Sequence, residues 1–229
     1  DGQALEYAIK LFNSIEDHSF DAEKDGYFEA FTREWAPIED MRLSDKDANE
    51  SKTMNTHLHV LEAYTCLYRV WKSSLLEERL RGLISIFEDK ILGTDSHLKL
   101  FFDDDWNCNY DIFSYGHDIE ASWLIHEAAL VLGDPEVLER IEKIVPHIAE
   151  AASEGFTPEG GMIYERVGEE IDRDRHWWVQ AESVVGYFNL WDHFGSRKDL
   201  ENALMCWDFI KASIIDKENG EWFWSLRAD

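Results

Sequence analysis

Apolar residues recur every three or four positions along seven stretches of this chain, which is the period of an amphipathic helix. In the first stretch the apolar positions are Leu5, Ala8, Ile9, Phe12 and Ile15. The predicted helices cover residues 3–18, 52–71, 75–92, 117–132, 135–153, 175–194 and 197–215. Gly93, Gly133 and Gly195 each follow one of these helices, at the position where glycine commonly ends a helix.

The segments between the helices also follow a pattern. Residues 32–50 form a polar stretch that contains Pro37, and residues 94–113 read as a loop. Residues 21–31 combine acids, a glycine and aromatic residues, which predicts a turn followed by a short extended piece; residues 155–167 read in the same way, and residues 216–224 echo 21–31. The chain therefore repeats one unit: a helix, a short connection, a second helix, and a loop with a strand-like piece.

Repeated helix pairs stack so that each pair buries the apolar face of its neighbour. A row of such pairs can stay open as a solenoid or close into an α/α toroid, whose inner ring consists of the first helix of each pair. Polar and aromatic residues recur near the starts of these first helices, which favours the toroid. We therefore expect an all-α protein with a single domain over residues 1–229, an incomplete toroid of about seven helices with short strand-like loops.

The richest group of polar residues starts the helix predicted at 117–132. A small, flexible lead-in, residues 114–116, precedes it, and steps of three then place His117, Glu120 and Trp123 on one broad face. These side chains supply a proton carrier, a carboxylate to orient it and a flat apolar surface for a sugar ring. The alternative is an ordinary helix start with a hydrogen-bonded histidine and a buried tryptophan.

Two other first helices carry comparable pairs. Asn55 and His59 are four residues apart and share a face, whereas His57 lies roughly opposite and is expected to be packed or solvent-facing. Trp178 and Glu182 are also four apart, and an indole next to a carboxylate is a common arrangement for holding a sugar. The alternative for this pair is a core tryptophan and a solvated acid.

The charge narrows the range of partners. With 22 Lys and Arg against 48 Asp and Glu, the net charge of −26 argues against nucleic acids and anionic membranes. No apolar run approaches the roughly 18–20 residues of a membrane span, and no signal-peptide pattern opens the chain. Three scattered cysteines lack metal-type spacing. We therefore expect a reduced, cytoplasmic protein. The chain has ten tryptophans, many of them beside acids and histidines, and this mixture of residues is common in carbohydrate pockets.

Metal binding is the main alternative to the interpretation of His117 and Glu120 as a proton carrier and its orienting carboxylate. The spacing of His117 and Glu120 can chelate a metal, but no second pair of this form is present, so His59 or Glu182 would have to join. The acid run 103–105 lacks the spacing of a calcium-binding EF-hand loop and is expected to be solvated. Phosphate-binding and serine-hydrolase motifs are absent from the sequence. We therefore expect no metal and no cofactor.

Three motifs, in this order and at this spacing, resemble the N-acylglucosamine 2-epimerase superfamily, and most closely its cellobiose-epimerising branch. They are MNTHLHVLEAY at 54–64, SYGHDIEASW at 114–123 and RHWWVQAE at 175–182. The resemblance implies an (α/α)6 barrel of twelve helices. It also implies inversion at C2 of a reducing-end sugar without a metal or a nucleotide redox cofactor. The expected substrate is the reducing-end glucose of cellobiose or a related β-1,4 disaccharide, and the reaction passes through a cis-enediolate.

The resemblance also implies a role for each matching residue. His117 is similar to one of two histidines that exchange the C2 proton, Glu120 would orient it, and His59 is similar to the histidine of ring opening. The residues expected to contact the sugar are Asn55, Trp123, Trp178 and Glu182. Three alternatives stay open: an N-acylglucosamine or mannose-type substrate, a glycoside hydrolase with two opposed carboxylates, and a non-catalytic carbohydrate-binding protein.

The chain also departs from the family pattern. About seven helices are predicted instead of twelve. The family's enediolate-binding arginine precedes the segment that Asp1 would match, and its second proton-exchanging histidine follows the segment that resembles residues 221–224. We therefore expect this chain to correspond to the central portion of the family's domain. We also expect it to have little activity by itself and to expose apolar helix faces that favour association.

Overall fold

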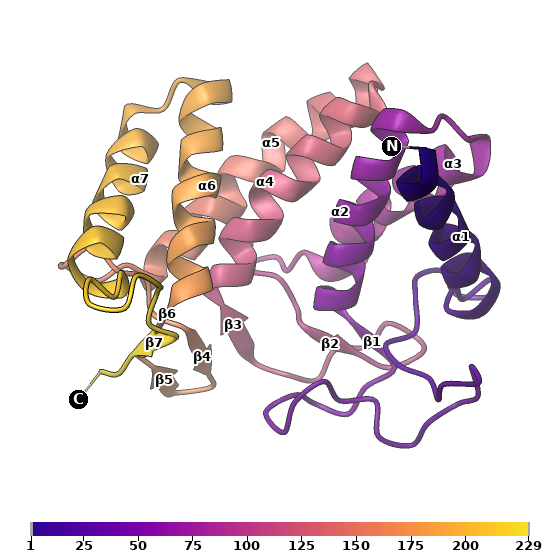
Figure 1. The fold of residues 1–229 in the computed structure, drawn as a ribbon, viewed down its shortest axis with the longest axis horizontal. Helices are drawn as coiled ribbons and strands as arrows, with labels where there is room; N and C mark the ends of the chain where they lie inside the picture. Colours follow the sequence, from indigo (N-terminus) through magenta and orange to yellow (C-terminus); the bar gives the residue numbers. More distant parts are fainter. Residues whose placement is uncertain (1, 229) are drawn as a thin grey trace. The chain divides into compact units, whose positions relative to one another are not determined.

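The computed structural model describes residues 2–228, and most of them are helical (Figure 1). Among these residues the α-helices are α1 Gly2–His18, α2 Met54–Val70, α3 Ser74–Ile86, α4 Tyr115–Leu132, α5 Pro135–Ala152, α6 Trp177–Phe194 and α7 Arg197–Phe209. These seven helices confirm the seven that the apolar pattern predicts. The predicted helices at 75–92 and 197–215 are longer than the α-helices observed there. Their last residues form short π-helical turns instead, η1 Phe87–Ile91 after α3 and η3 Ile210–Ile214 after α7.

A short strand precedes each first helix of a pair. The strand β1 Lys52–Thr53 ends where α2 begins, β3 Ile112–Ser114 ends where α4 begins, and β6 Arg175–His176 ends where α6 begins. The partners are all antiparallel: β1 pairs with β2 Phe101–Phe102, β3 with β4 Glu165–Val167, β4 with β5 Glu170–Asp172, and β6 with β7 Ser225–Leu226. The first residues assigned to two predicted helices, at 52–53 and 175–176, are thus strand residues.

The predicted turns are tight loops closed by a single bridge. Phe20 pairs with Tyr27, Phe156 with Met162, and Ile215 with Trp222, each in antiparallel fashion. The echo between residues 21–31 and 216–224 is therefore structural, and the internal repeat predicted from the sequence is present in the fold. These loops cross from the second helix of a pair toward the next strand (Figure 1).

The chain forms two compact units. The first runs to Leu92 and adds Lys99–Tyr110 and Glu127–Asp134. The second contains Gly93–Leu98, Asp111–His126 and the chain from Pro135 onward. A single domain over residues 1–229 stays a prediction.

In the first unit, α2 and α3 pack through leucines that have essentially no exposed surface. Leu58 and Leu61 come from α2, and Leu76 and Leu80 come from α3. Because burying one leucine side chain contributes about 1.5–3 kcal/mol, this seam is a main source of stability of the unit. Truncation of Leu61 to alanine is the kind of change that costs roughly 2–5 kcal/mol.

A carboxylate from α1, that of Glu16, links several elements around this core. Glu16 Oε1 accepts hydrogen bonds from the hydroxyls of Tyr27 at 2.8 Å and Tyr64 at 2.6 Å, and Glu16 Oε2 accepts one from Arg79 Nε at 2.5 Å. The carboxylate is therefore satisfied by two phenols and a guanidinium, which offsets the cost of its burial. This network ties α1, the 20–27 turn, α2 and α3 together.

In the second unit, α4 and α6 approach closely because one of them carries a glycine at the contact. A Cβ atom on Gly186 of α6 would lie 2.6 Å from Cγ1 of Ile119 in α4, so only glycine fits there. Gln180 of α6 holds the loop after α5, because its Oε1 accepts from Met162 N at 2.8 Å and its Nε2 donates to Met162 O at 2.7 Å. The helix starts and the adjoining loop are thus fixed by direct contacts.

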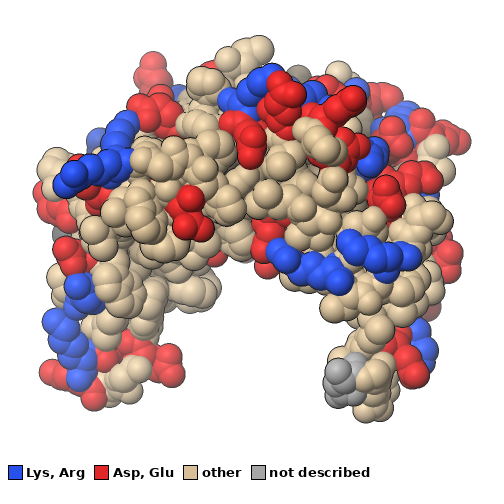
Figure 2. Space-filling model, turned by 90° about the horizontal axis from the view of Figure 1, so that it is seen from above, with Lys and Arg blue, Asp and Glu red and all other residues tan. Residues whose placement is uncertain are grey.

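Acidic side chains are spread over the face shown in Figure 2, with basic ones among them, in keeping with the net charge of −26. Within the described residues, no helix combines the length and the apolar character needed to cross a membrane.

Candidate active site

The imidazole of His117 lies in the first turn of α4, in the second unit. Ser114, the last residue of β3, places its Oγ 2.8 Å from His117 Nδ1. The ring of Trp178, in the first turn of α6, lies with its centroid 4.8 Å from the imidazole centroid at an angle of 47°. A strand end, a helix start and a neighbouring indole therefore fix one edge and one face of His117.

Gly116 allows this contact between two helices. A Cβ atom at position 116 would lie 2.7 Å from the ring of Trp178 and 2.8 Å from Val179, closer than real side chains approach. The expectation of a flexible lead-in at 114–116 is wrong: Ser114 ends a strand, and Tyr115 starts the helix with both side chains buried. Gly116 serves close packing rather than flexibility, and its partner is 62 residues away, so the local sequence does not show this role.

Trp123 and Glu182, both expected to contact sugar, contact each other. The indole Nε1 of Trp123 in α4 donates to Oε2 of Glu182 in α6 at 2.9 Å. Glu120, one turn before Trp123, is buried with 8% of its surface exposed. The indole thus holds the Glu182 carboxylate in place.

The second carboxylate at the start of α4 has a different task. Asp118 is fully buried; its Oδ2 lies 2.7 Å from His97 Nδ1, and its Oδ1 accepts from Leu98 N at 2.9 Å. Burial works against a charged imidazole, but the hydrogen bond and the charge of Asp118 raise the pKa of His97 above its ordinary value. This pair fastens residues 93–98 to the helix that carries His117, and a separation of 21 residues hides it from sequence motifs.

The start of α2, in the first unit, is held by hydroxyl groups. Thr53 caps the helix, because its Oγ1 accepts from Thr56 N at 3.0 Å. Glu29 Oε2 in turn accepts from the hydroxyls of Thr53 and Thr56, each at 2.5 Å. A carboxylate at this end of a helix also interacts favourably with the helix dipole. The helix that carries Asn55 and His59 therefore begins at a well-fixed point.

His59 is exposed, and its Nδ1 lies 3.1 Å from Glu62 Oε2, one turn further along α2. Glu62 was not among the predicted site residues, although the spacing of three residues is a signal for such a contact. Asn55, one turn before His59, is half-buried. The helical spacing places both on one side of α2.

His57 is packed, which confirms one of the two outcomes expected for it. Its Nδ1 lies 2.6 Å from Thr53 O, and its Nε2 accepts from Tyr27 N at 2.9 Å. Burial lowers the pKa of His57 to about 4, so the ring is neutral near pH 7. A neutral imidazole with a proton on Nδ1 satisfies both bonds.

The structure thus places five of the predicted residues on α4 and α6 in the second unit, where His117 contacts Trp178 and Trp123 contacts Glu182, and two on α2 in the first unit. The five are His117, Glu120, Trp123, Trp178 and Glu182. Among the residues that the structure describes, no group of three His, Cys, Asp or Glu side chains is placed to hold a metal ion. In the acid run, Asp103 instead accepts hydrogen bonds from Asn107 and from the backbone of Asp105, and its neighbours are exposed, as expected of a solvated loop.

Helix pairs introduced by short strands, with an imidazole and an indole at the helix starts, are typical of α/α-type sugar isomerases and epimerases. The chain belongs to the N-acylglucosamine 2-epimerase (GlcNAc 2-epimerase) family, which it matches over residues 32–229.

Within this family the chain is similar to cellobiose 2-epimerases. It is 62% identical to the cellobiose 2-epimerase of Bacteroides fragilis over 232 residues, which cover 100% of this chain and 59% of the relative. The cellobiose 2-epimerase of Ruminococcus albus is 40% identical with the same coverage. The chain therefore spans about three-fifths of the length of the relatives it matches.

Solved structures give the same result for the fold. The structure of cellobiose 2-epimerase from Bacillus thermoamylovorans superposes with a TM-score of 0.93 at 40% identity, over 100% of this chain and 59% of that chain. A D-mannose isomerase superposes with a TM-score of 0.82 at 19% identity, which speaks for the fold alone. The expected fold, the corresponding part of an α/α toroid, is confirmed.

Proposed function

We propose that this chain is the part of a cellobiose 2-epimerase that holds the sugar and exchanges its C2 proton. The observation that carries the proposal is the fixed arrangement of His117 against Trp178, in a chain 62% identical to a cellobiose 2-epimerase. An indole face suits the C–H face of a sugar, and the adjacent imidazole is a proton carrier that works near neutral pH.

The proton at C2 becomes removable only once the sugar ring has opened, because the free aldehyde at C1 makes it acidic. His59 is the proposed acid and base for ring opening, with Glu62 at 3.1 Å to orient its imidazole. Asn55, on the same side of α2, supplies an amide that hydrogen-bonds to the sugar. Ring opening and ring closure are reverse steps, so one histidine serves both.

His117 then takes the C2 proton and forms the cis-enediolate. Ser114 accepts from or donates to its Nδ1, depending on the tautomer, and so holds the ring in one orientation. Glu120, one turn further on and buried, lies on the same helix face and is the group proposed to orient the imidazole. General-base catalysis of this kind contributes about 10²–10⁴-fold to the rate.

Inversion requires the proton to return from the opposite side of the enediolate. A second proton carrier must therefore approach C2 from the side opposite His117. His57 and His97 are both engaged in buried hydrogen bonds that fix neighbouring loops, which makes them unsuitable for this task. Meanwhile Trp178 stacks on the sugar, and Glu182, held by Trp123, accepts its hydroxyls.

The test is a His117→Asn exchange in the full-length gene product, with cellobiose in heavy water. We expect deuterium incorporation at C2 and formation of glucosyl-mannose to fall by about 10²–10⁴-fold, because the proton carrier is lost while the polar contact to Ser114 can remain. His147→Asn is the matched control, since His147 is an exposed histidine on the outer helix α5. Undiminished exchange in His117→Asn contradicts the role proposed for His117.

The substrate preference is tested by comparing three sugars. Cellobiose, mannose and N-acetylglucosamine are supplied separately, and kcat/KM is compared. We expect the highest value for cellobiose; a preference for the acetylated sugar or for mannose overturns this part of the proposal.

A further inference from the structure

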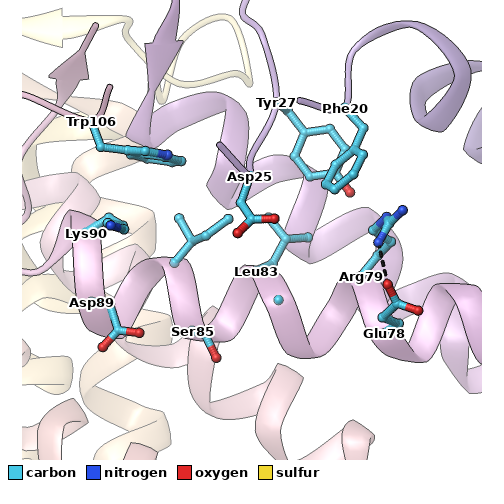
Figure 3. Close-up of a pocket in the computed structure, with 12 residues that line it drawn as sticks. Phe20, Asp25, Tyr27, Glu78, Arg79, Leu83, Ser85, Asp89, Lys90 and Trp106 are labelled. Atoms are coloured by element: carbon cyan, nitrogen blue, oxygen red, sulfur yellow. Dashed lines mark hydrogen bonds and ion pairs between the residues drawn. The ribbon is translucent and has the colours of Figure 1, made fainter. Parts of the chain in front are cut away.

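A pocket of about 230 Å³ opens in the first unit, and none of the residues proposed for the reaction lines it (Figure 3). Its walls come from the 20–27 turn, from α3 with η1, and from Trp106. The residues that matter for the argument are Phe20, Asp25, Gly82, Ser85, Asp89 and Trp106. Trp106 packs against His57, whereas His59 lies on the opposite side of α2, so the pocket and His59 face away from each other across this helix.

Trp106 forms a rigid aromatic wall. Its backbone adopts a φ of 66°, a conformation that is rare for a bulky residue, and its Nε1 donates to Lys24 O at 2.9 Å. The ring also packs against His57 at 5.0 Å and Phe102 at 5.2 Å between centroids. A ring held by its backbone, its nitrogen and its neighbours offers a preformed surface, which lowers the entropic cost of binding a ligand.

One buried ammonium group fixes the two turns that shape the pocket. Lys52 has no exposed surface, and its Nζ donates to Asp21 Oδ2 at 2.7 Å, to Asp25 O at 2.9 Å and to Asp104 O at 3.2 Å. The first two bonds hold the turn that presents Asp25, and the third holds the turn that presents Trp106. The spacing between Asp25 and Trp106 is therefore set by the fold.

Gly82 widens the pocket without being required by packing. Glycine destabilises a helix interior, and a Cβ atom at this position would meet no atom within 4 Å. The backbone of Gly82 is ordinary α-helix, so its conformation does not require glycine either. The absence of a side chain here leaves open space next to Ser85 and Asp89, which follow on the same helical segment.

The polar groups of the pocket suit hydroxyl groups. Within the described part of the chain, the carboxylates of Asp25 and Asp89 and the hydroxyl of Ser85 have no hydrogen-bond partner. Arg79 is not available to an anion, because it is paired with Glu16 and with Glu78 (Figure 3). The carboxylate of Asp25 lies between Trp106 and the rings of Phe20 and Tyr27 in the same view.

From this geometry we propose that the pocket is a second carbohydrate site, which takes one hexose ring of a neutral saccharide. The ring stacks on Trp106, and its hydroxyls donate to the carboxylates of Asp25 and Asp89. The volume, below the roughly 300–1,000 Å³ of pockets for drug-sized ligands, fits a single ring and not a disaccharide. This site goes beyond the proposed function, because it involves neither His117 nor His59.

The test uses protein with isotope-labelled tryptophan and follows indole N–H signals by NMR during titration with methyl β-D-glucopyranoside. Trp106→Phe identifies the Trp106 signal, and Trp123 reports on the candidate active site.

Gly82→Phe fills the pocket from a helix position that tolerates a side chain, and Gly82→Ala is the matched control that leaves the pocket open. We expect Gly82→Phe to weaken the Trp106 response at least about tenfold and Gly82→Ala to leave it within about twofold.

The two reporters separate this proposal from the proposed function. A Trp106 response that Gly82→Phe removes, at an unlowered melting temperature, supports the second site. A titration that moves Trp123 and not Trp106, or a Trp106 response that persists in Gly82→Phe, overturns it and leaves the proposed function in place. A response of Trp106 to tetramethylammonium chloride but not to the glucoside overturns the assignment to a neutral sugar. Movement of Trp106 alone supports the second site and counts against sugar binding at His117.

Discussion

His57 and His59 are two residues apart on α2, yet their surroundings differ in almost every respect. His57 is fully buried between Thr53 O and Tyr27 N, and His59 is exposed beside Glu62. A helix turns about 200° over two residues, so one imidazole faces the core and the other faces outward. The first stabilises the fold in its neutral form, and the second is available for chemistry.

This difference predicts a pH dependence of stability. The pKa of His57 is about 4 in the folded protein and is near 6.5 in an unfolded chain, because burial disfavours the charged ring. Between these values only the unfolded state binds a proton, so stability is greatest above about pH 6.5 and falls as the pH drops toward 4. The loss from this one group is on the order of 3 kcal/mol.

The prediction is checked by urea unfolding from pH 7.5 to pH 4.5 in the parent protein and in His57→Gln. Glutamine keeps one donor and one acceptor but does not titrate, so we expect a shallower loss of stability on acidification. His147→Gln, at an exposed position, serves as the control and is expected to follow the parent protein. Equal slopes in His57→Gln and the parent protein would show that His57 is not the titrating group.

Gly116 gives the second prediction at the scale of the residue. In Gly116→Ala the new methyl group would lie 2.7 Å from the Trp178 ring, so the ring has to move away from His117. Because a small displacement of a reacting group can cost about 10²-fold, we expect kcat/KM for cellobiose to fall by about 10–10². Gly82→Ala, an alanine in an uncrowded helix position, is expected to keep the activity. Full activity of Gly116→Ala would mean that the indole position does not matter.

At the scale of the element, the helices show how much of the secondary structure the local sequence pattern predicts. All seven follow from the spacing of apolar residues, and the glycine after α6 is indeed a left-handed cap, Gly195 with φ 70°. Most of the strands were not predicted: β1 and β6 lie in predicted helices, β2 lies in a predicted loop, and only β4 falls in a predicted extended piece. Two or three residues carry too little pattern to reveal a strand or its pairing partner. β1 pairs with a strand about 50 residues away, and β6 pairs with one equally distant.

Gln180 joins an element to a loop, and its removal is predicted to loosen the second unit. In Gln180→Leu the backbone N–H and C=O of Met162 lose their partners while buried. Each unsatisfied group costs about 1–3 kcal/mol, so we expect a loss of roughly 2–5 kcal/mol in the free energy of unfolding by urea. Ser183→Ala is the matched control. Ser183 Oγ donates to Val179 O, a carbonyl that also accepts the backbone hydrogen bond of the helix, so the loss of the hydroxyl leaves no buried group without a partner. A loss no larger than that of Ser183→Ala contradicts the role of Gln180.

At the scale of the whole molecule, the excess of acids sets the response to salt. With 48 Asp and Glu against 22 Lys and Arg, like charges repel across the surface, and this repulsion is weaker in the extended unfolded chain. Salt at about 0.15 M screens charges beyond about 8 Å. We expect the melting temperature to rise by a few degrees between low salt and physiological salt, measured by calorimetry, with an uncharged osmolyte at equal osmolality as the control. A melting temperature that falls with salt would show that attractive pairs dominate.

The family membership is reflected in residues, in elements and in the length of the chain. The three motifs that resemble the family each contain a helix start and a side chain proposed for the site, and each of these helices directly follows a short strand and is the first of a helix pair. The chain spans about three-fifths of the length of its relatives, and each of its two units carries part of the predicted site residues.

The sequence by itself determined the helices, their pairing into repeats, and the identity of the polar residues at the helix starts. These depend on periodicity and on spacings of three or four residues, which act within one or two helical turns. Only the tertiary structure decided that Gly116 makes room for Trp178, that Trp123 holds Glu182, and that Asp118 serves His97. Each of these contacts joins residues 21 to 62 positions apart, and a contact over such a distance depends on how elements pack against each other, which no local pattern encodes.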